Sequence, residues 1–287
     1  MDGNVSISHV TVNISVYSVT LNRLGVIGLI QGVQLYISDV ITTISAGLTD
    51  YGQQQSAIIA SSNVKMCVVQ RVIIFASNIT SLQFSGGFFG IIENTNLQVT
   101  DSLLNSSIIS CFRDYCGGIA GYIIESEILM SNMSVCTNIS GQYSSGYIAC
   151  SIITNVKIID SKVQNMYISS LQYVGGFIGT TGMIGYNNSG MKTVTLQNSQ
   201  IVNSNLNAQN AGGFFGFTYW TNLVISGSKV ISVHITGTIS QGIVLAVQSV
   251  NTTISITTSM SLGSNYINDV LQANCVSFVN TQSITQC

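Results

Sequence analysis

The sequence predicts an all-β protein, a parallel β-solenoid (a three-sided β-helix) of about eight to nine coils with a period of about 30 residues. Three observations carry this prediction. Apolar and polar residues alternate, a short hydrophobic motif returns once in every period, and proline is absent from all 287 residues. Period-two alternation is typical of strands, and proline would interrupt a hydrogen-bond ladder. A regular repeat of this kind indicates stacked supersecondary units.

The period is set by a glycine-containing motif. "GGFFG" ends at Gly90 and Gly216, "GGIAG" at Gly121 and "GGFIG" at Gly179, and the weaker copies "GVIG", "AIIA", "GYIA" and "GIVL" complete the series. The copies follow one another at nearly constant steps, except for one longer step from Gly179 to Gly216. Such a unit is too short for the four strands of a propeller blade, which need about 40–45 residues. Three short strands and three corners fit, and stacking at roughly 4.8 Å per coil gives a rod about 40 Å long.

A polar corner follows each motif by eleven residues. It falls at Asp39, Arg71, Asp101, Asn132, Asp160 and Gly227, with Asn198 in the same place after an insertion. Ser102, Ser161, Ser199 and Ser228 come directly after four of these residues. Because Asp and Asn side chains often bond to nearby backbone groups, we expect the corner residues themselves to cap the turns.

The glycine motif admits two interpretations, a phosphate-binding loop and a structural turn. No Lys-Ser/Thr pair and no helical pattern follows it, and it recurs in every coil, which favours structure. The second glycines are expected to permit a tight turn or a positive φ, and the last ones to leave room for bulky neighbours. The second set is Gly87, Gly118, Gly146, Gly176 and Gly213, and the last set is Gly90, Gly121, Gly179 and Gly216. Five phenylalanines are expected to stack between coils in the core: Phe88, Phe89, Phe177, Phe214 and Phe215.

The motifs "GGFFG", "GGIAG" and "GGFIG", each followed by Asn/Ser-rich alternation, resemble the GLUG-type repeats of β-helical surface proteins. Similar arrays are found in large repeat proteins of protists, diplomonads in particular. The resemblance covers nearly the whole chain and implies a β-helix in a surface setting. It supplies no catalytic residue.

The composition argues against several function classes. Only 6% of residues are charged and the net charge is −2, so we expect no nucleic-acid partner and no polybasic membrane patch. The longest apolar runs, such as "LGVIGLI", are far shorter than the roughly 18 residues of a spanning helix, so no membrane span is expected. The seven cysteines match no zinc pattern, and we expect no metal and no cofactor. Only Cys111 and Cys116 are close enough for a local disulfide, and most of the others are expected to be buried in strands.

The chain is interpreted as one solenoid domain, residues 1–287, belonging to a longer array, because neither end has an obvious cap. The start, "MDGNVSISHV", has no signal-peptide pattern, so the expected extracellular or cell-surface location applies to the longer chain. Eight sequons occur, two of them at Asn4 and Asn13. Six are predicted as possible glycosylation sites: Asn78, Asn105, Asn132, Asn138, Asn187 and Asn251.

The best candidate for a binding site is the insertion at residues 180–192, which lengthens one coil. Insertions in solenoids project from one face, often the binding face. Met183 and Tyr186 lie in the insertion, and Tyr219 and Trp220 occupy the corresponding place in the next coil. Aromatic side chains at a rim suit a carbohydrate or a protein surface, but they could equally pack beneath the loop.

Two functions are compatible with these features. The first is a non-catalytic structural or adhesive solenoid that presents loops for carbohydrate or protein binding. The second is a β-helix carbohydrate-active enzyme, a polysaccharide lyase or glycoside hydrolase, for which Glu93 and Glu125 are the pair of acids to check. The histidines, His9 and His234, are some seven coils apart and cannot share a nucleophilic site. We expect the first function, with no catalytic residues.

Overall fold

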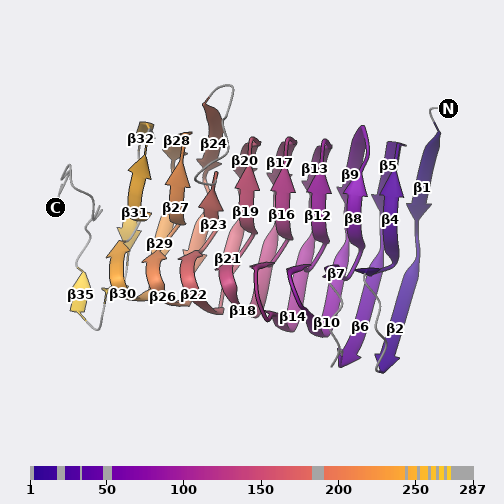
Figure 1. The fold of residues 1–287 in the computed structure, drawn as a ribbon, viewed down its shortest axis with the longest axis horizontal. Helices are drawn as coiled ribbons and strands as arrows, with labels where there is room; N and C mark the ends of the chain where they lie inside the picture. The colour runs from indigo at the N-terminus through magenta and orange to yellow at the C-terminus, as the bar shows by residue number, and fades with distance from the viewer. Residues whose placement is uncertain are drawn as a thin grey trace.

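The structure is a computed structural model that describes residues 3–17, 23–32, 34–47, 54–182, 191–242, 245–250, 253–257, 260–262, 265–267 and 270–272. Its described residues form strands joined by short turns, stacked into a rod with the first and last strands of sheet A at opposite ends (Figure 1). Within these ranges there is no helix of the length and hydropathy that a bilayer span requires. The predicted parallel β-solenoid is therefore confirmed.

Three sheets run along the rod. Sheet A has nine parallel strands, β1 (Asn4–Ser8), β5 (Gln34–Ser38), β9 (Met66–Gln70), β13 (Asn96–Thr100), β17 (Glu127–Ser131), β20 (Asn155–Ile159), β24 (Lys192–Gln197), β28 (Thr221–Ser226) and β32 (Thr253–Thr257). Sheet C has eight, β4 (Ile27–Gln31), β8 (Ile59–Asn63), β12 (Phe89–Glu93), β16 (Ala120–Ile124), β19 (Ile148–Ile152), β23 (Ile178–Thr181), β27 (Phe215–Tyr219) and β31 (Leu245–Val250).

Sheet B contains the remaining strands, most coils contributing a long strand and a short one. Its members are β2 (Thr11–Tyr17), β3 (Arg23–Leu24), β6 (Ile41–Gly47), β7 (Gln54–Ser56), β10 (Ile73–Ser81), β11 (Phe84–Gly86), β14 (Leu103–Cys111), β15 (Tyr115–Gly117), β18 (Ser134–Ser145), β21 (Lys162–Gln164), β22 (Tyr167–Gly175), β25 (Gln200–Val202), β26 (Asn205–Gly212), β29 (Lys229–Ile231), β30 (His234–Gly242), β33 (Met260–Leu262), β34 (Asn265–Ile267) and β35 (Val270–Gln272). Only β34 and β35 pair antiparallel among the described strands.

The strand register reproduces the sequence period. Leu97 lies opposite Cys67 on one side and Ile128 on the other, each of them one motif repeat away along the chain. The one long step, from Val156 to Val194, spans the insertion. Sheets of nine and eight strands agree with the expected eight to nine coils.

Inward residues form columns through the rod. In sheet A one column runs from Leu35 through Cys67 and Leu97 to Ile128 and beyond, and all four side chains are buried. Cys67 therefore acts as a small apolar residue, and burial raises the pKa of its thiol to about 12. The five phenylalanines are buried as predicted. Phe177 and Phe214, from adjacent coils, have ring centroids 6.0 Å apart.

Sheet C is buried on both faces, which the sequence did not predict. Residues 85–92 are buried without a break, although they include the turn at Gly87 and Phe88 between two strands. The chain turns sharply after Gly86, between the short sheet-B strand β11 and the sheet-C strand β12. The short strands of sheet B therefore cover the outer face of sheet C. A Cβ added at Gly121 would lie 2.8 Å from the Ser85 carbonyl oxygen in the coil before. The last glycine of each motif thus allows close backbone contact between two layers, rather than leaving room for side chains.

The second glycine of each motif lies in a turn between strands, as expected, but without the positive φ that was the other expectation. Among the described residues, positive φ occurs at Gly32, Gly182 and Gly227 but at no glycine of this second set. Instead these glycines stack on one another along the rod. The Gly87 amide donates to the Gly118 carbonyl at 2.8 Å, and a Cβ at Gly118 would collide with the Gly146 carbonyl. Their lack of a side chain, not their access to φ > 0, is what the fold uses.

The polar corners between sheets A and B do turn through the left-handed region. Their φ angles lie between 49° and 60°, at His9, Asp39, Arg71, Asp101, Asn132, Asp160, Asn198 and Gly227. Asn and Asp tolerate this conformation better than most residues. The capping, however, is done by the following serine. Ser102 Oγ donates to the Thr100 carbonyl at 2.7 Å and accepts the Val72 amide of the previous coil at 3.0 Å.

Three further coils repeat this serine arrangement, through Ser161, Ser199 and Ser228. The prediction that Asp and Asn cap these turns is therefore wrong where the contacts are described. Their side chains instead link neighbouring coils: Asn132 Nδ2 donates to Asp101 Oδ1 at 2.8 Å, and Arg71 forms two bonds to Asp39 at 2.6 and 2.8 Å. The serine is one residue away from the corner because only there does its hydroxyl reach the adjoining coil's amide.

A second apolar cluster lies between the short strands of sheet B and the outer face of sheet C. Tyr115, Ala149, Cys150 and Ile152 form its buried part. Phe84, Tyr115, Tyr143 and Tyr173 stack in consecutive coils, with centroids 5.8, 4.8 and 5.7 Å apart. Burial raises the pKa of Tyr115 and Tyr143. The predicted Cys111–Cys116 disulfide is present beside this cluster.

The outward faces are less uniform than the expected coat of Ser, Thr, Asn and Gln. Sheet B exposes Ile41, Phe75 and Ile108, each more than 40% accessible, and Leu171 is 68% accessible. Alternation assigns these positions to the outside, but it does not require polar side chains there.

Candidate functional site

The corner between sheets C and A contains the residues that depart most from the repeat. It turns through the left-handed region at Asn94, Glu125, Ile153, Gly182 and Trp220. Asn and Gly adopt this conformation at little energetic cost, whereas a β-branched or bulky residue is an outlier there. Ile153 (φ 50°) and Trp220 (φ 49°) are the two such outliers at this corner among the described residues. Each is expected to cost about 1–3 kcal/mol of backbone strain.

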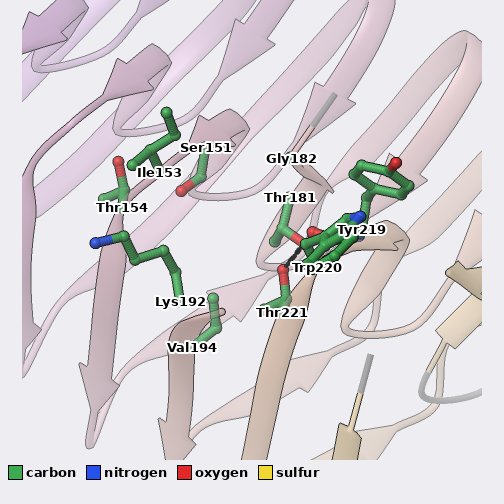
Figure 2. A pocket seen from close by; sticks show the side chains of 10 residues that line it. All are labelled: Ser151, Ile153, Thr154, Thr181, Gly182, Lys192, Val194, Tyr219, Trp220 and Thr221. Carbon is green, nitrogen blue, oxygen red and sulfur yellow. Dashed lines mark hydrogen bonds between the residues drawn. The ribbon is translucent and has the colours of Figure 1, made fainter. Parts of the chain in front are cut away.

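Both strained residues line one pocket. Its wall includes Ile153, Thr154, Thr181, Lys192, Tyr219 and Trp220, drawn together in Figure 2. These come from three consecutive coils, the ends of β19, β23 and β27 and the start of β24. The pocket is a partly open depression, and its water-accessible volume of about 10 Å³ holds about one water-sized group. A larger ligand would therefore insert one polar group and lie mainly across the rim.

Threonine hydroxyls fix the floor of the pocket. Thr221 Oγ1 donates to the Tyr219 carbonyl at 2.9 Å and lies 2.8 Å from Thr181 Oγ1, the contact dashed in Figure 2. The Tyr219 amide donates to Thr181 Oγ1 at 3.4 Å. Thr154, two coils before Thr221, repeats the pattern by donating to the Ile152 carbonyl at 2.8 Å. These bonds hold the backbone of Ile153 and Trp220 in the left-handed conformation.

The rim carries an aromatic surface and a cation. The indole of Trp220 is exposed, at 36% accessibility, and its ring centroid lies 6.3 Å from that of Tyr219. Lys192 is half-buried, and its backbone amide donates to the Trp220 carbonyl at 3.4 Å. In the register of sheet A, Lys192 pairs with Thr221, the residue after Trp220. The lysine and the tryptophan thus belong to adjacent coils at one corner.

Charge is unevenly distributed along the rod. Residues 54–149 contain three basic and five acidic side chains, whereas residues 150–242 contain four lysines and one aspartate. Among the residues that the structure describes, no carboxylate lies within ion-pairing distance of Lys192. The pocket therefore lies in the more positive half of the molecule.

The structure brings together only part of the predicted site. Tyr219 and Trp220 share the pocket, while Met183, Tyr186 and the sequon Asn187 lie outside the described residues, as does Asn251. Of the insertion at residues 180–192, Thr180 and Thr181 end β23 and Lys192 begins β24. Sequence reasoning missed Ile153 and Lys192. Aligning the coils on Asn94 and Glu125 would have shown an isoleucine at a corner position that favours polar residues.

The acids proposed for an enzyme do not face each other in register. Glu93 lies opposite Ile124, and Glu125 is the corner residue that follows it. Glu127 accepts a hydrogen bond from Asn155 Nδ2 at 2.7 Å, a contact between coils. In the described part of the chain, no group of three or more His, Cys, Asp or Glu side chains could hold a metal ion.

The described sequons differ in their surroundings. Asn78 and Asn105 lie within long strands of sheet B, and Asn105 is exposed. Asn132 uses its side-chain amide as a donor to the previous coil. Asn138 is exposed and its Oδ1 accepts a backbone amide from the next coil at 3.1 Å. Glycosylation at these positions stays a prediction.

Comparison with known proteins found no matching family model, no matching curated protein and no matching solved structure.

Proposed function

We propose that this chain is a non-catalytic structural or adhesive segment of a cell-surface or secreted repeat protein, and that the corner containing Trp220 binds a carbohydrate. The stacked coils form a rigid spacer. The pocket binds the carbohydrate, with the Trp220 ring as the surface on which a sugar ring packs.

The observation that carries the proposal is the strain at Ile153 and Trp220. A corner of this type is most stable with Asn or Gly, as at Asn94 and Gly182. Costly residues persist where they serve a purpose other than stability. Here they line the same pocket, and one of them presents an exposed indole.

Contacts elsewhere on the rod support a structural role for the rest of the molecule. The charged side chains with described partners mostly join one coil to the next, as Asp39 joins Arg71 and Glu127 joins Asn155. Such contacts align stacked coils and hold these groups in place.

The experiment is glycan-array binding by the whole chain and by Trp220→Asn. Asparagine removes the aromatic surface while suiting the left-handed backbone, so the variant should unfold at the same or a higher temperature yet lose its glycan signal. Phe75→Thr is the matched control, because it removes an exposed aromatic residue from sheet B, where Thr43 occupies the same column. Its glycan signal should equal that of the parent.

Two results would contradict the proposal. One is the absence of any glycan signal from the parent chain. The other is equal signal from the parent and Trp220→Asn, since the corner would then play no part in binding.

A further inference from the structure

The pocket combines a cation, an aromatic ring and a very small enclosed space. Lys192 and Trp220 lie on adjacent coils, joined by the 3.4 Å bond from the Lys192 amide to the Trp220 carbonyl. Figure 2 shows the Lys192 side chain extending toward Thr154, on the opposite side of the pocket lining from the Trp220 ring, which lies beside Tyr219. A ligand that spans both must carry one group for each.

From this arrangement we infer that the site selects carbohydrates that carry a carboxylate, such as uronic acids, over neutral ones. The inference rests on the proposed carbohydrate-binding function and specifies its ligand class. The carboxylate contacts the Lys192 ammonium at the mouth of the enclosed space, and the sugar ring lies across the indole of Trp220.

The chemistry of the lining explains the choice of a negative group. The hydroxyls of Thr154, Thr181 and Thr221 already bond to corner backbone or to each other. The ammonium of Lys192 is therefore the strongest donor that the lining offers a ligand. A charge-assisted hydrogen bond is about twice as strong as a neutral one, so the Lys192 ammonium binds an anionic group more tightly than a neutral one.

The charges around the pocket also favour a negatively charged ligand. Residues 150–242 carry four lysines against one aspartate, and Lys157 is exposed on the same sheet as Lys192. A ligand with a carboxylate is attracted by this half of the rod, whereas a neutral sugar is not. The small enclosed space has room for one oxygen of the carboxylate but not for a sugar ring.

The test measures binding of an oligogalacturonate, its methyl ester and a dextran sulfate oligosaccharide by titration calorimetry. The methyl ester keeps the sugar rings and removes the charge. The whole chain should bind the oligogalacturonate about tenfold or more tightly than the ester, the size expected for one charge-assisted hydrogen bond. Lys192→Gln should abolish this preference and Lys192→Arg should retain it.

Lys229→Gln is the matched control, since it removes the same charge from an exposed position in sheet B. It should leave the preference for the acid intact. Equal binding of acid and ester would overturn the inference while leaving carbohydrate binding in place. Equal effects of Lys192→Gln and Lys229→Gln would also overturn it, because the preference would then come from the general field.

The dextran sulfate arm separates carboxylate recognition from attraction of any anion, because this glycan carries sulfates and no carboxylates. Dextran sulfate should bind less tightly than the oligogalacturonate, because a bulky sulfate does not enter a space for about one water-sized group. Tighter, Lys192-independent binding of dextran sulfate would overturn the inference. If no galacturonate binds but the array shows a neutral glycan signal that depends on Trp220, the ligand class is wrong and the proposed function stands. Loss of both the galacturonate binding and the glycan-array signal contradicts both the inference and the proposed function.

Discussion

At the scale of single residues, the fold depends on glycines that have no room for a side chain. Gly118 donates its amide to the Ser145 carbonyl at 3.1 Å, and an added Cβ would collide with the Gly146 carbonyl and lie 2.7 Å from Val135 Cγ1. The carbonyl belongs to the next coil's backbone, so relief requires the stack itself to separate.

We therefore expect Gly118→Ala to lower the free energy of unfolding by about 3 kcal/mol or more, the upper range for overpacking. Gly32→Ala is the control: it adds a Cβ at a positive φ (69°) with nothing within 4 Å, and should cost only about 1 kcal/mol. Urea unfolding followed by circular dichroism measures both. Equal losses in the two variants would show that conformation, not contact with the next coil, decides the role of Gly118.

Buried polar groups of single residues also have specific hydrogen-bond partners. Tyr147 is buried among apolar side chains, yet its hydroxyl donates to the Met133 carbonyl at 2.9 Å. Burial raises the pKa of this phenol. A buried aromatic residue with a satisfied hydroxyl stabilises one packing arrangement over others.

At the scale of elements, four of the described corners between sheets A and B are stabilised by a serine hydroxyl that belongs to the following coil. Ser161 Oγ donates to the Ile159 carbonyl at 2.7 Å and accepts the Met133 amide at 3.3 Å. The contact with the Met133 amide is buried and the contact with the Ile159 carbonyl is partly buried, so removing the hydroxyl leaves a buried amide without a partner.

Ser161→Ala should consequently lower the free energy of unfolding by about 1–3 kcal/mol, the cost of an unsatisfied buried group. Ser131→Ala, at a half-buried position on β17, should change it by less than about 0.5 kcal/mol. Thermal unfolding of the two variants beside the parent makes the comparison. A Ser161→Ala variant as stable as Ser131→Ala would contradict the role given to the serine.

The sequence predicted the elements well and their layering incompletely. Strands, period and the corners at Asp101 and Asn132 follow from alternation and spacing, which are local properties. The packing of the short sheet-B strands against the outer face of sheet C depends on contact between Gly121 and Ser85, which belongs to another coil. No local pattern encodes such a contact, so the second cluster around Tyr115 was not foreseen.

The candidate site was predicted in the same partial way. The aromatic pair at Tyr219 and Trp220 was visible because it breaks the motif. Lys192 and Ile153 looked ordinary in sequence, and only the register of neighbouring coils places them beside Trp220.

At the scale of the whole molecule, the ion pair of Asp39 and Arg71 should make stability depend on pH in the acid range. The hydrogen bonds and charge of Arg71 lower the pKa of Asp39 from 3.8 to about 2. A carboxyl whose pKa is lower in the folded state stabilises the fold above its unfolded value, and this contribution is lost as the pH falls. The window of loss is therefore pH 4 to 2.

We expect the urea midpoint of the parent to fall between pH 4 and pH 2, and that of Asp39→Asn to fall less. The effect should be modest, because the pair is exposed and screened by salt. Asp114, whose pKa is raised by burial, contributes in the opposite sense and is unchanged in the variant. Identical acid-induced losses in the two proteins would contradict the contribution assigned to the Asp39–Arg71 pair.

By itself the sequence determined the architecture of the rod: alternation specifies strands, the regular return of the motif specifies coils, and the absence of proline permits unbroken ladders. Only the tertiary structure decided which residues meet across coils. The glycines of the motif became backbone contacts, serines rather than aspartates became the caps, and Ile153, Lys192 and Trp220 came to line one pocket. The physical reason is that a repeat fixes positions within a coil through local geometry, whereas each contact between coils depends on side chains a full period apart in the sequence.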